Sequence, residues 1–296
     1  MKFRSFLQRW LQQEDLNFLL TNRIPRITLT LWMGWWSQIR HPWVVRPSMA
    51  VWKFFGNLDL KDARQQKFES LHDCFTRELL PGSRLVNRDS GLLTAPCDAI
   101  VGACGEIQNG QIFQAKGFPY TLQDLLGSSN ACIKWLELVE GGQFITLRLT
   151  SGMYHRFHAP HDVKLEHVTY ISGDTWNVNP ISLQRVEKLF CKNERAVLHM
   201  RLQDGPAFLM VPVAAVLVAS MRLHAADVLL HLRYKGPNEI PCNNLYAKGD
   251  EMGWFQHGST ILMFLPRGFQ LIEKIGPNTL VQMGQPLFRI VERYKS

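Results

Sequence analysis

The sequence predicts an α+β protein, in which a group of N-terminal helices precedes an antiparallel, β-rich core. In the first eighty residues, apolar side chains recur at spacings of three and four, which is typical of amphipathic helices. Further along, short apolar runs are bounded by Gly, Pro, Asn or Asp, which indicates strands and turns. With 296 residues, of which 46% are hydrophobic, the chain is long enough to bury a sizeable core.

The N-terminal helices are predicted from three separate stretches. Phe3, Phe6, Leu7, Trp10 and Leu11 follow the helical period and form one face of a basic amphipathic helix. Two more helices are expected at about 27–39 and 47–55. A short amphipathic helix is expected within residues 66–84, which end in a Pro-Gly turn.

Positive charge and tryptophan are concentrated in this N-terminal region. Residues 1–55 contain eight basic and two acidic side chains, and six of the nine tryptophans. Cationic side chains and indole rings together are attracted to the headgroups of anionic lipids. We therefore expect residues 1–65 to bind a membrane surface, although helices that only cap the core would also fit. The chain shows no nucleic-acid-binding motif, so no nucleic-acid partner is expected.

No segment is expected to span a bilayer or to act as a signal peptide. The uncharged run at 27–39 is shorter than the roughly 20 residues that a spanning helix needs. The run at 205–221 contains two prolines and is better explained by buried strands. Glu14 and Asp15 interrupt the only candidate signal region. The six cysteines form no CxxC pair, which favours reduced thiols in a cytoplasmic protein.

The β-rich region is expected to extend from residue 66 to residue 296 and to form a single catalytic domain. Two helices interrupt its strands, one near 121–126 and one near 180–190, with Asn179 as the expected cap and Pro180 at the first helical position. The strands are predicted at 143–149, 163–171, 196–202, 260–265, 270–275 and 286–291.

Two neighbourhoods contain residue types that carry acid–base chemistry. Asp98 follows a proline and precedes an apolar run, so it could either act chemically or close a turn. His155, His158 and His161 are three residues apart, but Pro160 argues for an extended segment, in which residues three apart point to opposite sides. No cysteine or carboxylate pattern completes a zinc site nearby. Acid–base catalysis is therefore favoured over metal binding or a structural role.

The third neighbourhood is the Gly258-Ser259 pair, which precedes an apolar strand. It lacks the second glycine of the G-x-S-x-G elbow of hydrolases. A glycine before a serine leaves the carbonyl group without a side chain to screen it. An attack by the Ser259 hydroxyl on its own preceding peptide bond would need this arrangement, although a simple turn is the alternative.

Six segments of residues 66–291 form a recognisable set in this order and spacing. They are F-x-S-x-x-x-x-F-x-R at 68–77, A-P-x-D-A at 95–99, A-K-G-x-x-Y at 115–120, Y-H-R-F-H-A-P at 154–160, L-F-x-x-N-E-R at 189–195 and K-G-x-E-M-G-x-F-x-x-G-S-T at 248–260. Taken together, these motifs resemble the phosphatidylserine decarboxylase proenzyme family. Two local differences are His257, where leucine is common, and Ser151-Gly152-Met153, where an arginine–aspartate approach is more usual.

The resemblance implies a self-made cofactor. In such a protein Asp98 orients His158, which takes a proton from Ser259, and Ser259 attacks the Gly258 carbonyl. Cleavage would give a large chain, 1–258, and a small chain, 259–296, whose first residue becomes a pyruvoyl group. The substrate phosphatidylserine would form a Schiff base with that group and lose CO₂, with His155 as the expected proton donor. The product would be phosphatidylethanolamine, and no metal is implied.

The resemblance also implies a homodimer attached to the cytoplasmic face of a bacterial inner membrane. Three other functions remain open. A lipid-binding protein without activity would need the loss of residues that are all present. A serine hydrolase with the same three residues would stay a single polypeptide, whereas a pyruvoyl enzyme becomes two. Decarboxylation of a soluble amino acid would not need the N-terminal region that favours membranes.

Overall fold

The fold is given by a computed structural model, which describes residues 13–56, 58–115, 118–127, 130–217, 220–256 and 259–291. Its largest feature is an antiparallel eight-stranded sheet with the order β12-β7-β8-β9-β14-β5-β2-β16. Its strands are β2 (Ala99–Glu106), β5 (Gln143–Leu149), β7 (Val163–Ile171), β8 (Arg195–Leu202), β9 (Ala207–Ala214), β12 (Glu239–Tyr246), β14 (Ser259–Leu265) and β16 (Leu280–Val281).

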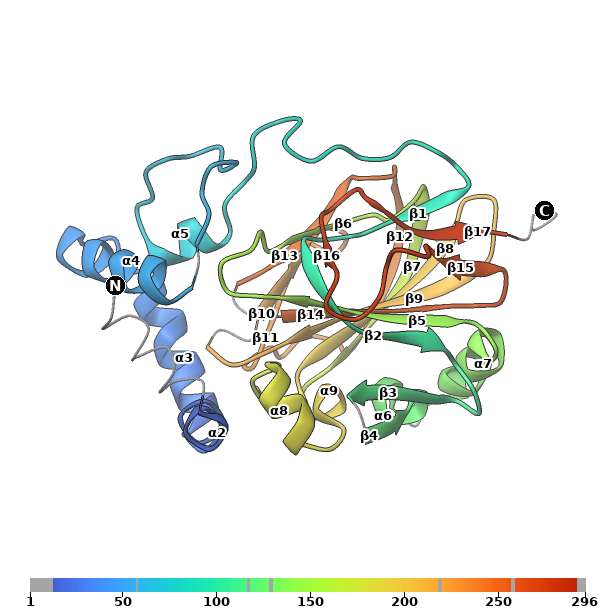
Figure 1. The fold of residues 1–296 in the computed structure, drawn as a ribbon, viewed down its shortest axis with the longest axis horizontal. Coiled ribbons are helices and arrows are strands. Elements are labelled where there is room, and N and C mark those ends of the chain that lie inside the picture. The colour runs from blue at the N-terminus through green and yellow to red at the C-terminus, as the bar shows by residue number, and fades with distance from the viewer. Residues whose placement is uncertain are drawn as a thin grey trace.

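Three smaller antiparallel sheets complete the body (Figure 1). A four-stranded sheet has the order β11-β10-β13-β6, a three-stranded sheet has the order β1-β17-β15, and β3 pairs with β4. Their strands are β1 (Leu92–Thr94), β3 (Gln111–Ala115), β4 (Phe118–Thr121), β6 (Arg156–His158), β10 (Ser220–Leu223), β11 (Val228–His231), β13 (Glu251–Phe255), β15 (Phe269–Leu271) and β17 (Pro286–Ile290). The prediction of an antiparallel, β-rich core is confirmed.

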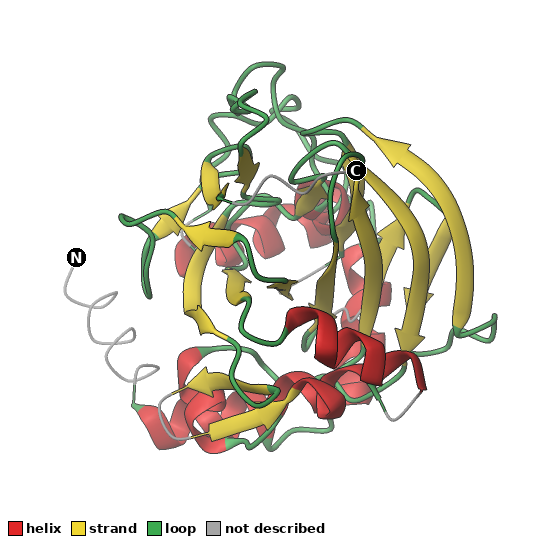
Figure 2. Ribbon diagram, turned by 90° about the vertical axis from the view of Figure 1, so that its right-hand side faces the viewer, coloured by secondary structure: helices red, strands yellow, loops and turns green. Residues whose placement is uncertain are grey.

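The central strands of the large sheet are buried on both faces. Along β8, Ala196 and Leu198 belong to one apolar cluster, which includes Phe157 and Phe255 of the small four-stranded sheet. Val197 points to the opposite face and belongs to a second cluster. Helices α6 (Leu122–Leu126), α7 (Asn130–Val139), α8 (Pro180–Arg185) and α9 (Leu189–Lys192) cover that second face, below the sheet in Figure 1, and Figure 2 shows the curvature of the strands.

The N-terminal helices are α2 (Glu14–Asn22), α3 (Arg26–Ser37) and α4 (Pro42–Phe55), and α5 (Leu71–Phe75) follows them. Their contacts with the β-rich part of the chain, residues 92–290 (the body), include several polar ones. Asn22 donates to Ser182 Oγ at 2.8 Å, and Arg26 forms an ion pair with Asp174. Thr30 Oγ1 accepts a hydrogen bond from the backbone of Leu217 at 3.1 Å.

Most element predictions agree with the structure, with a few shifts. The cap at Asn179 and the first-turn position of Pro180 are confirmed, but the expected helix at 180–190 is two short helices, because Lys188 adopts a left-handed conformation between them. The helix expected from residue 47 begins at Pro42, and Pro47 lies inside it. The strand expected at 270–275 ends at Leu271. The helix predicted from Phe3 to Leu11 lies outside the described residues.

The described part of α2–α4 presents large aromatic and aliphatic side chains to solvent. Trp43 is 86% exposed and Trp35 is 62% exposed. Within the described residues, none of the helices combines the length and the apolar character that crossing a membrane requires. The helical region is therefore present, and its binding to a membrane stays a prediction.

Candidate active site

Ser259 is the first residue of β14 and lies in the middle of the large sheet. Its backbone pairs with Leu149 of β5 on one side and with Ala214 of β9 on the other. Residues directly opposite each other in antiparallel strands share a face, and both neighbours belong to the interior cluster. Ser259 is fully buried, and its hydroxyl has no hydrogen-bond partner among the described residues. Gly258 lies outside the described residues.

The segment 149–155 is fixed at both ends by backbone contacts with β13 and β14. At one end Leu149 pairs with Ser259, and at the other end the backbone N–H of Phe255 donates to the His155 carbonyl at 2.9 Å. The turn between β5 and β6, which contains Tyr154, is therefore held beside Ser259 of β14 at one end and beside Phe255 of β13 at the other.

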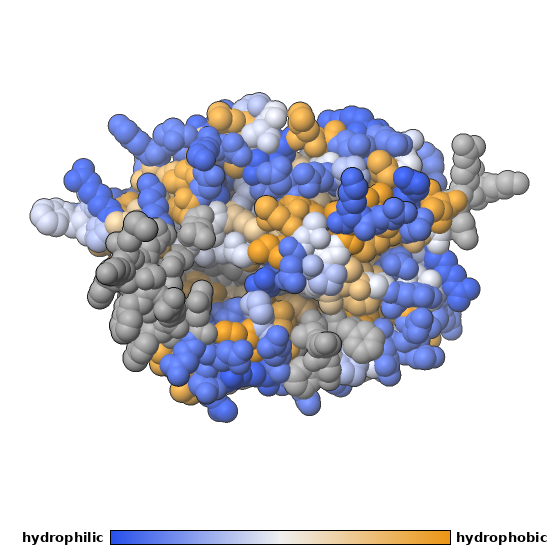
Figure 3. Space-filling model, viewed as in Figure 1, coloured by the Kyte–Doolittle hydropathy of each residue, from blue (hydrophilic) through white to orange (hydrophobic). Residues whose placement is uncertain are grey.

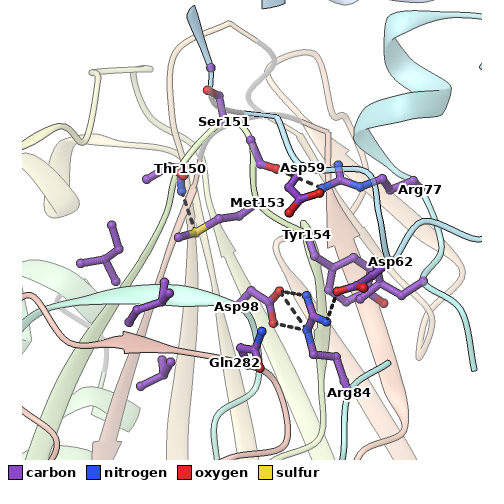
Figure 4. A pocket seen from close by; sticks show the side chains of 16 residues that line it. Asp59, Asp62, Arg77, Arg84, Asp98, Thr150, Ser151, Met153, Tyr154 and Gln282 are labelled. Carbon is purple, nitrogen blue, oxygen red and sulfur yellow. Dashed lines mark hydrogen bonds and ion pairs between the residues drawn. The ribbon is translucent and has the colours of Figure 1, made fainter. Parts of the chain in front are cut away.

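Asp98 lies between β1 and β2 and is almost completely buried. Both of its carboxylate oxygens accept hydrogen bonds from the Arg84 guanidinium, at 2.6 to 3.1 Å (Figure 4). The backbone N–H of Met283 also donates to Asp98, at 2.9 Å. Arg84 in turn pairs with Asp62 at 2.8 Å. The Asp98 carboxylate is therefore paired with an arginine rather than with a histidine.

His158 ends β6 with both of its ring nitrogens occupied. Nδ1 lies 3.0 Å from the Gly249 carbonyl, and Nε2 lies 3.0 Å from the Tyr154 hydroxyl. Burial lowers the pKa of His158, and the bond to Gly249 opposes that effect only in part. A carbonyl can only accept, so Nδ1 carries the proton and Nε2 is the basic nitrogen. The imidazole is therefore a neutral base at pH 7.

His155 is fully buried beside these residues, in contact with aromatic rings. Its Nδ1 lies 2.8 Å from the Met153 carbonyl. Its ring centroid is 4.0 Å from that of Phe75 in α5, and Phe75 stacks on Trp52 of α4 at 5.7 Å. This line of rings connects the N-terminal helices to the turn that precedes β6.

The structure brings Asp98 and His158 into one neighbourhood, but no hydrogen bond joins their side chains. The backbone N–H of His158 donates to the carbonyl of Pro96 at 2.8 Å, and the charge of Asp98 acts on the pKa of His158. Arg84 holds the carboxylate, and Gly249 takes the bond that Asp98 would make to the imidazole. The predicted relay through Asp98, His158 and Ser259 thus stays a prediction.

Two adjoining cavities border these residues. The larger measures about 610 Å³ and is lined by Asp98, Arg77, Arg84 and the turn at 150–154 (Figure 4). The smaller measures about 250 Å³ and includes His158. Tyr154 and Arg84 line both cavities. In Figure 3, apolar side chains reach the surface among hydrophilic ones near the middle of the face shown.

Sequence reasoning missed Arg77, Arg84 and Tyr154 as candidate site residues. Arg77 and Tyr154 lie inside motifs that were recognised, so their membership in those motifs was the available signal. Arg84 follows a Pro-Gly turn, and nothing in its surroundings in the sequence indicates that it pairs with Asp98. Among the residues that the structure describes, no three His, Cys, Asp or Glu side chains are grouped to hold a metal ion.

Comparisons with known proteins agree on one family. A family model described as phosphatidylserine decarboxylase matches residues 71–289. The chain is 31% identical to a phosphatidylserine decarboxylase proenzyme of Aliivibrio fischeri, over 94% of this chain and 99% of that protein. Proteins with the same name from Klebsiella pneumoniae and Shewanella putrefaciens are 30% and 35% identical. Those two alignments cover 94% and 77% of this chain, and 89% and 81% of the relatives.

Proposed function

The chain belongs to the phosphatidylserine decarboxylase family, and on that premise we propose that it converts phosphatidylserine into phosphatidylethanolamine and CO₂. The observation that carries this proposal is the position of Ser259. Its hydroxyl is fully buried at the start of a central strand, has no hydrogen-bond partner among the described residues, and follows a glycine in the sequence. A buried hydroxyl without an acceptor is disfavoured unless it has another role.

That role is attack on the Gly258 carbonyl. The attack forms an ester, and elimination then divides the precursor into chains 1–258 and 259–296. Elimination leaves a dehydroalanine at the start of the small chain, and water converts it into a pyruvoyl group with release of ammonia. That group would supply a ketone able to combine with the headgroup amine and to take up the electrons released with CO₂. The unbonded Ser259 hydroxyl fits this conversion, because no hydrogen bond to a described residue has to break first.

His158 is the base in this proposal, and His155 returns a proton to the product. The neutral state of His158, favoured by burial, suits removal of a proton from a hydroxyl. Asp98 can orient His158 only if its carboxylate releases Arg84 and accepts a hydrogen bond from the imidazole instead. Until then the Gly249 carbonyl keeps the ring in the tautomer with a basic Nε2.

The cavity of about 610 Å³ is the proposed site of the lipid headgroup. Arg77 and Arg84 on its wall are suited to anionic phosphate and carboxylate groups. Arg84 is already paired with two aspartates. Arg77 is 5% exposed, donates to backbone carbonyls, and has no carboxylate within 4.0 Å among the described residues.

The N-terminal helices are proposed to hold the enzyme at the bilayer surface, on the cytoplasmic face of the inner membrane. Exposed Trp35 and Trp43 lie close in sequence to exposed Arg40, Arg46 and Lys53, and such a mixture favours the headgroup layer. Membrane binding would let the headgroup reach the site while the acyl chains of the substrate stay in the bilayer. A homodimer remains a prediction from the family.

The test is release of CO₂ from vesicles that contain carboxyl-labelled phosphatidylserine. Wild-type protein is expected to release label, and Ser259→Ala is expected to release none. Ser182→Ala, which changes another fully buried serine, in α8, is the matched control and should keep activity. Release of fatty acid or free headgroup by the wild type would favour the hydrolase, and no turnover at all would favour a lipid-binding protein.

A further inference from the structure

Tyr154 occupies the only basic nitrogen of His158. Nδ1 donates to the Gly249 carbonyl, so it already carries a proton and cannot accept another. Nε2 holds the lone pair, and the Tyr154 hydroxyl donates to it at 3.0 Å. A proton that reaches His158 must therefore pass through the Tyr154 hydroxyl or displace it.

Tyr154 borders both cavities of the candidate site. It is 5% exposed and lines both cavities, whereas His158 lines only the smaller one. It also lies in the turn whose ends are fixed beside Phe255 and Ser259 by backbone pairing. Burial raises the pKa of the Tyr154 phenol, so the hydroxyl keeps its proton near neutral pH and can donate and accept at once.

We propose that the Tyr154 hydroxyl relays the proton from Ser259 to Nε2 of His158 during self-cleavage. This inference rests on the proposed function. As the bond from Ser259 Oγ to the Gly258 carbonyl carbon forms, the Oγ proton moves to the phenol oxygen and the phenol proton moves to Nε2. When the bond from that carbon to the Ser259 nitrogen breaks, the imidazolium returns one proton through the same hydroxyl to the leaving amine.

The charged groups around His158 allow it to change protonation state. Glu251 and Asp98 act to raise its pKa, and Arg156 acts to lower it. Glu78 and Arg84 line the same small cavity. The imidazolium formed in the step therefore has carboxylates nearby, although burial keeps the resting ring neutral.

A different role for Tyr154 makes the opposite prediction. If the hydroxyl only covers Nε2, its removal would expose the base to Ser259 and accelerate cleavage. If it relays the proton, its removal would leave the base without a path. Tyr154→Phe deletes the hydroxyl and keeps the ring, so one variant separates the two roles.

The experiment follows cleavage of newly translated precursor in a cell-free system, by intact mass against time, between pH 5 and pH 8. Tyr154→Phe is expected to cleave about 100-fold more slowly, within the range of general acid–base contributions. The matched control is Tyr170→Phe, which removes another buried phenol hydroxyl, one bonded to Glu194 and to the His231 carbonyl. It should cleave at the wild-type rate.

The pH profile distinguishes a relay from a structural role. The phenol donates to the neutral imidazole and stabilises it, so Tyr154→Phe should raise the pKa of His158 and move the acid limb of the profile to higher pH. Cleavage of Tyr154→Phe at the wild-type rate, or faster, would overturn the relay while leaving the proposed function intact. A wild type that stays whole would overturn both.

A second measurement covers the case in which Tyr154→Phe folds poorly. In uncleaved Ser259→Ala protein, nitrogen NMR of His158 reports its tautomer directly. A proton on Nδ1 and a hydrogen bond at Nε2 are expected throughout the neutral range. A proton on Nε2 would remove the acceptor that the relay requires and would overturn the proposal.

Discussion

The N-terminal helices expose apolar side chains to solvent, whereas the surroundings of Ser259 bury polar ones. Helices α2 to α4 contact the body through hydrogen bonds and an ion pair, and present tryptophan rings to solvent. Around Ser259, by contrast, an ion pair, two histidines and hydroxyl groups are buried beside an apolar cluster. The proposed membrane contact and the proposed chemistry therefore involve separate sets of residues.

One contact connects the two regions. Trp52 of α4 stacks on Phe75, and Phe75 lies against His155. Removing the helices as a block would therefore disturb the candidate site as well as the proposed membrane contact. Single substitutions in each region test the separation more cleanly.

The largest effect is expected from Arg84→Met. The side chains of Arg84 and Asp98 are 11% and 10% exposed, and removing one partner of a buried pair costs about 3–5 kcal/mol of folding free energy. Urea unfolding of the uncleaved Ser259→Ala protein measures this loss. Arg64→Met is the control, because Arg64 pairs with Glu78 on the exposed surface; an equal loss in both variants would contradict the account of the Arg84–Asp98 pair.

A second effect concerns the pH dependence of stability, which we expect to arise in the body. Burial raises the pKa of Glu194 to about 7 and lowers that of His199 to about 4. Glu194 stays protonated in the fold up to about pH 7, so its contribution to stability decreases as pH rises from about 4.5 to 7. His199 resists protonation in the fold, so its contribution decreases as pH falls from about 6.5 to 4. Each change is on the order of 3 kcal/mol.

Because these two contributions oppose each other, single substitutions should reveal them. Relative to wild type, Glu194→Gln should lose stability on acidification from pH 7 to pH 4.5, and His199→Gln should gain it. Urea midpoints at several pH values provide the measurement. If the urea midpoints of both variants changed with pH as those of the wild type do, neither group would have a pKa that differs between the folded and unfolded states.

The smallest effect is expected from Trp43→Ala, in the other region. Trp43 is 86% exposed, so the fold should be unaffected, while loss of its contact with lipid should weaken vesicle binding about tenfold. Co-sedimentation with vesicles containing phosphatidylserine measures the affinity, and intact mass checks self-cleavage. Unchanged sedimentation, with Trp35→Ala giving the same result, would show that these helices do not form the membrane contact.

Local features of the fold could be predicted from the sequence. Asn179 and Pro180 mark the start of α8 because each satisfies a local requirement of a helix N-terminus. The strands at 143–149 and 163–171 have the expected bounds. The order of strands could not be predicted, because it depends on pairings between segments far apart, such as Ser259 with Leu149 and Ala214.

The same limit applies to the site. Asp98, His155, His158 and Ser259 are candidates because they lie in recognisable motifs. Arg84 pairs with Asp98 across a loop, and no pattern in the sequence predicts this pairing. The role of Tyr154 depends on which nitrogen of His158 faces it, and that is set by the Gly249 carbonyl 91 residues further along the chain.

The proposed function depends on one step, in which Ser259 cuts its own chain and becomes the cofactor. This step can be tested by the intact mass of the purified wild type beside Ser259→Ala. We expect two chains in the wild type, divided between residues 258 and 259, with a small chain blocked at its N-terminus, and one chain of 34.1 kDa in the variant. A wild type that stays whole in the presence of phosphatidylserine vesicles would show that Ser259 does not cut the chain.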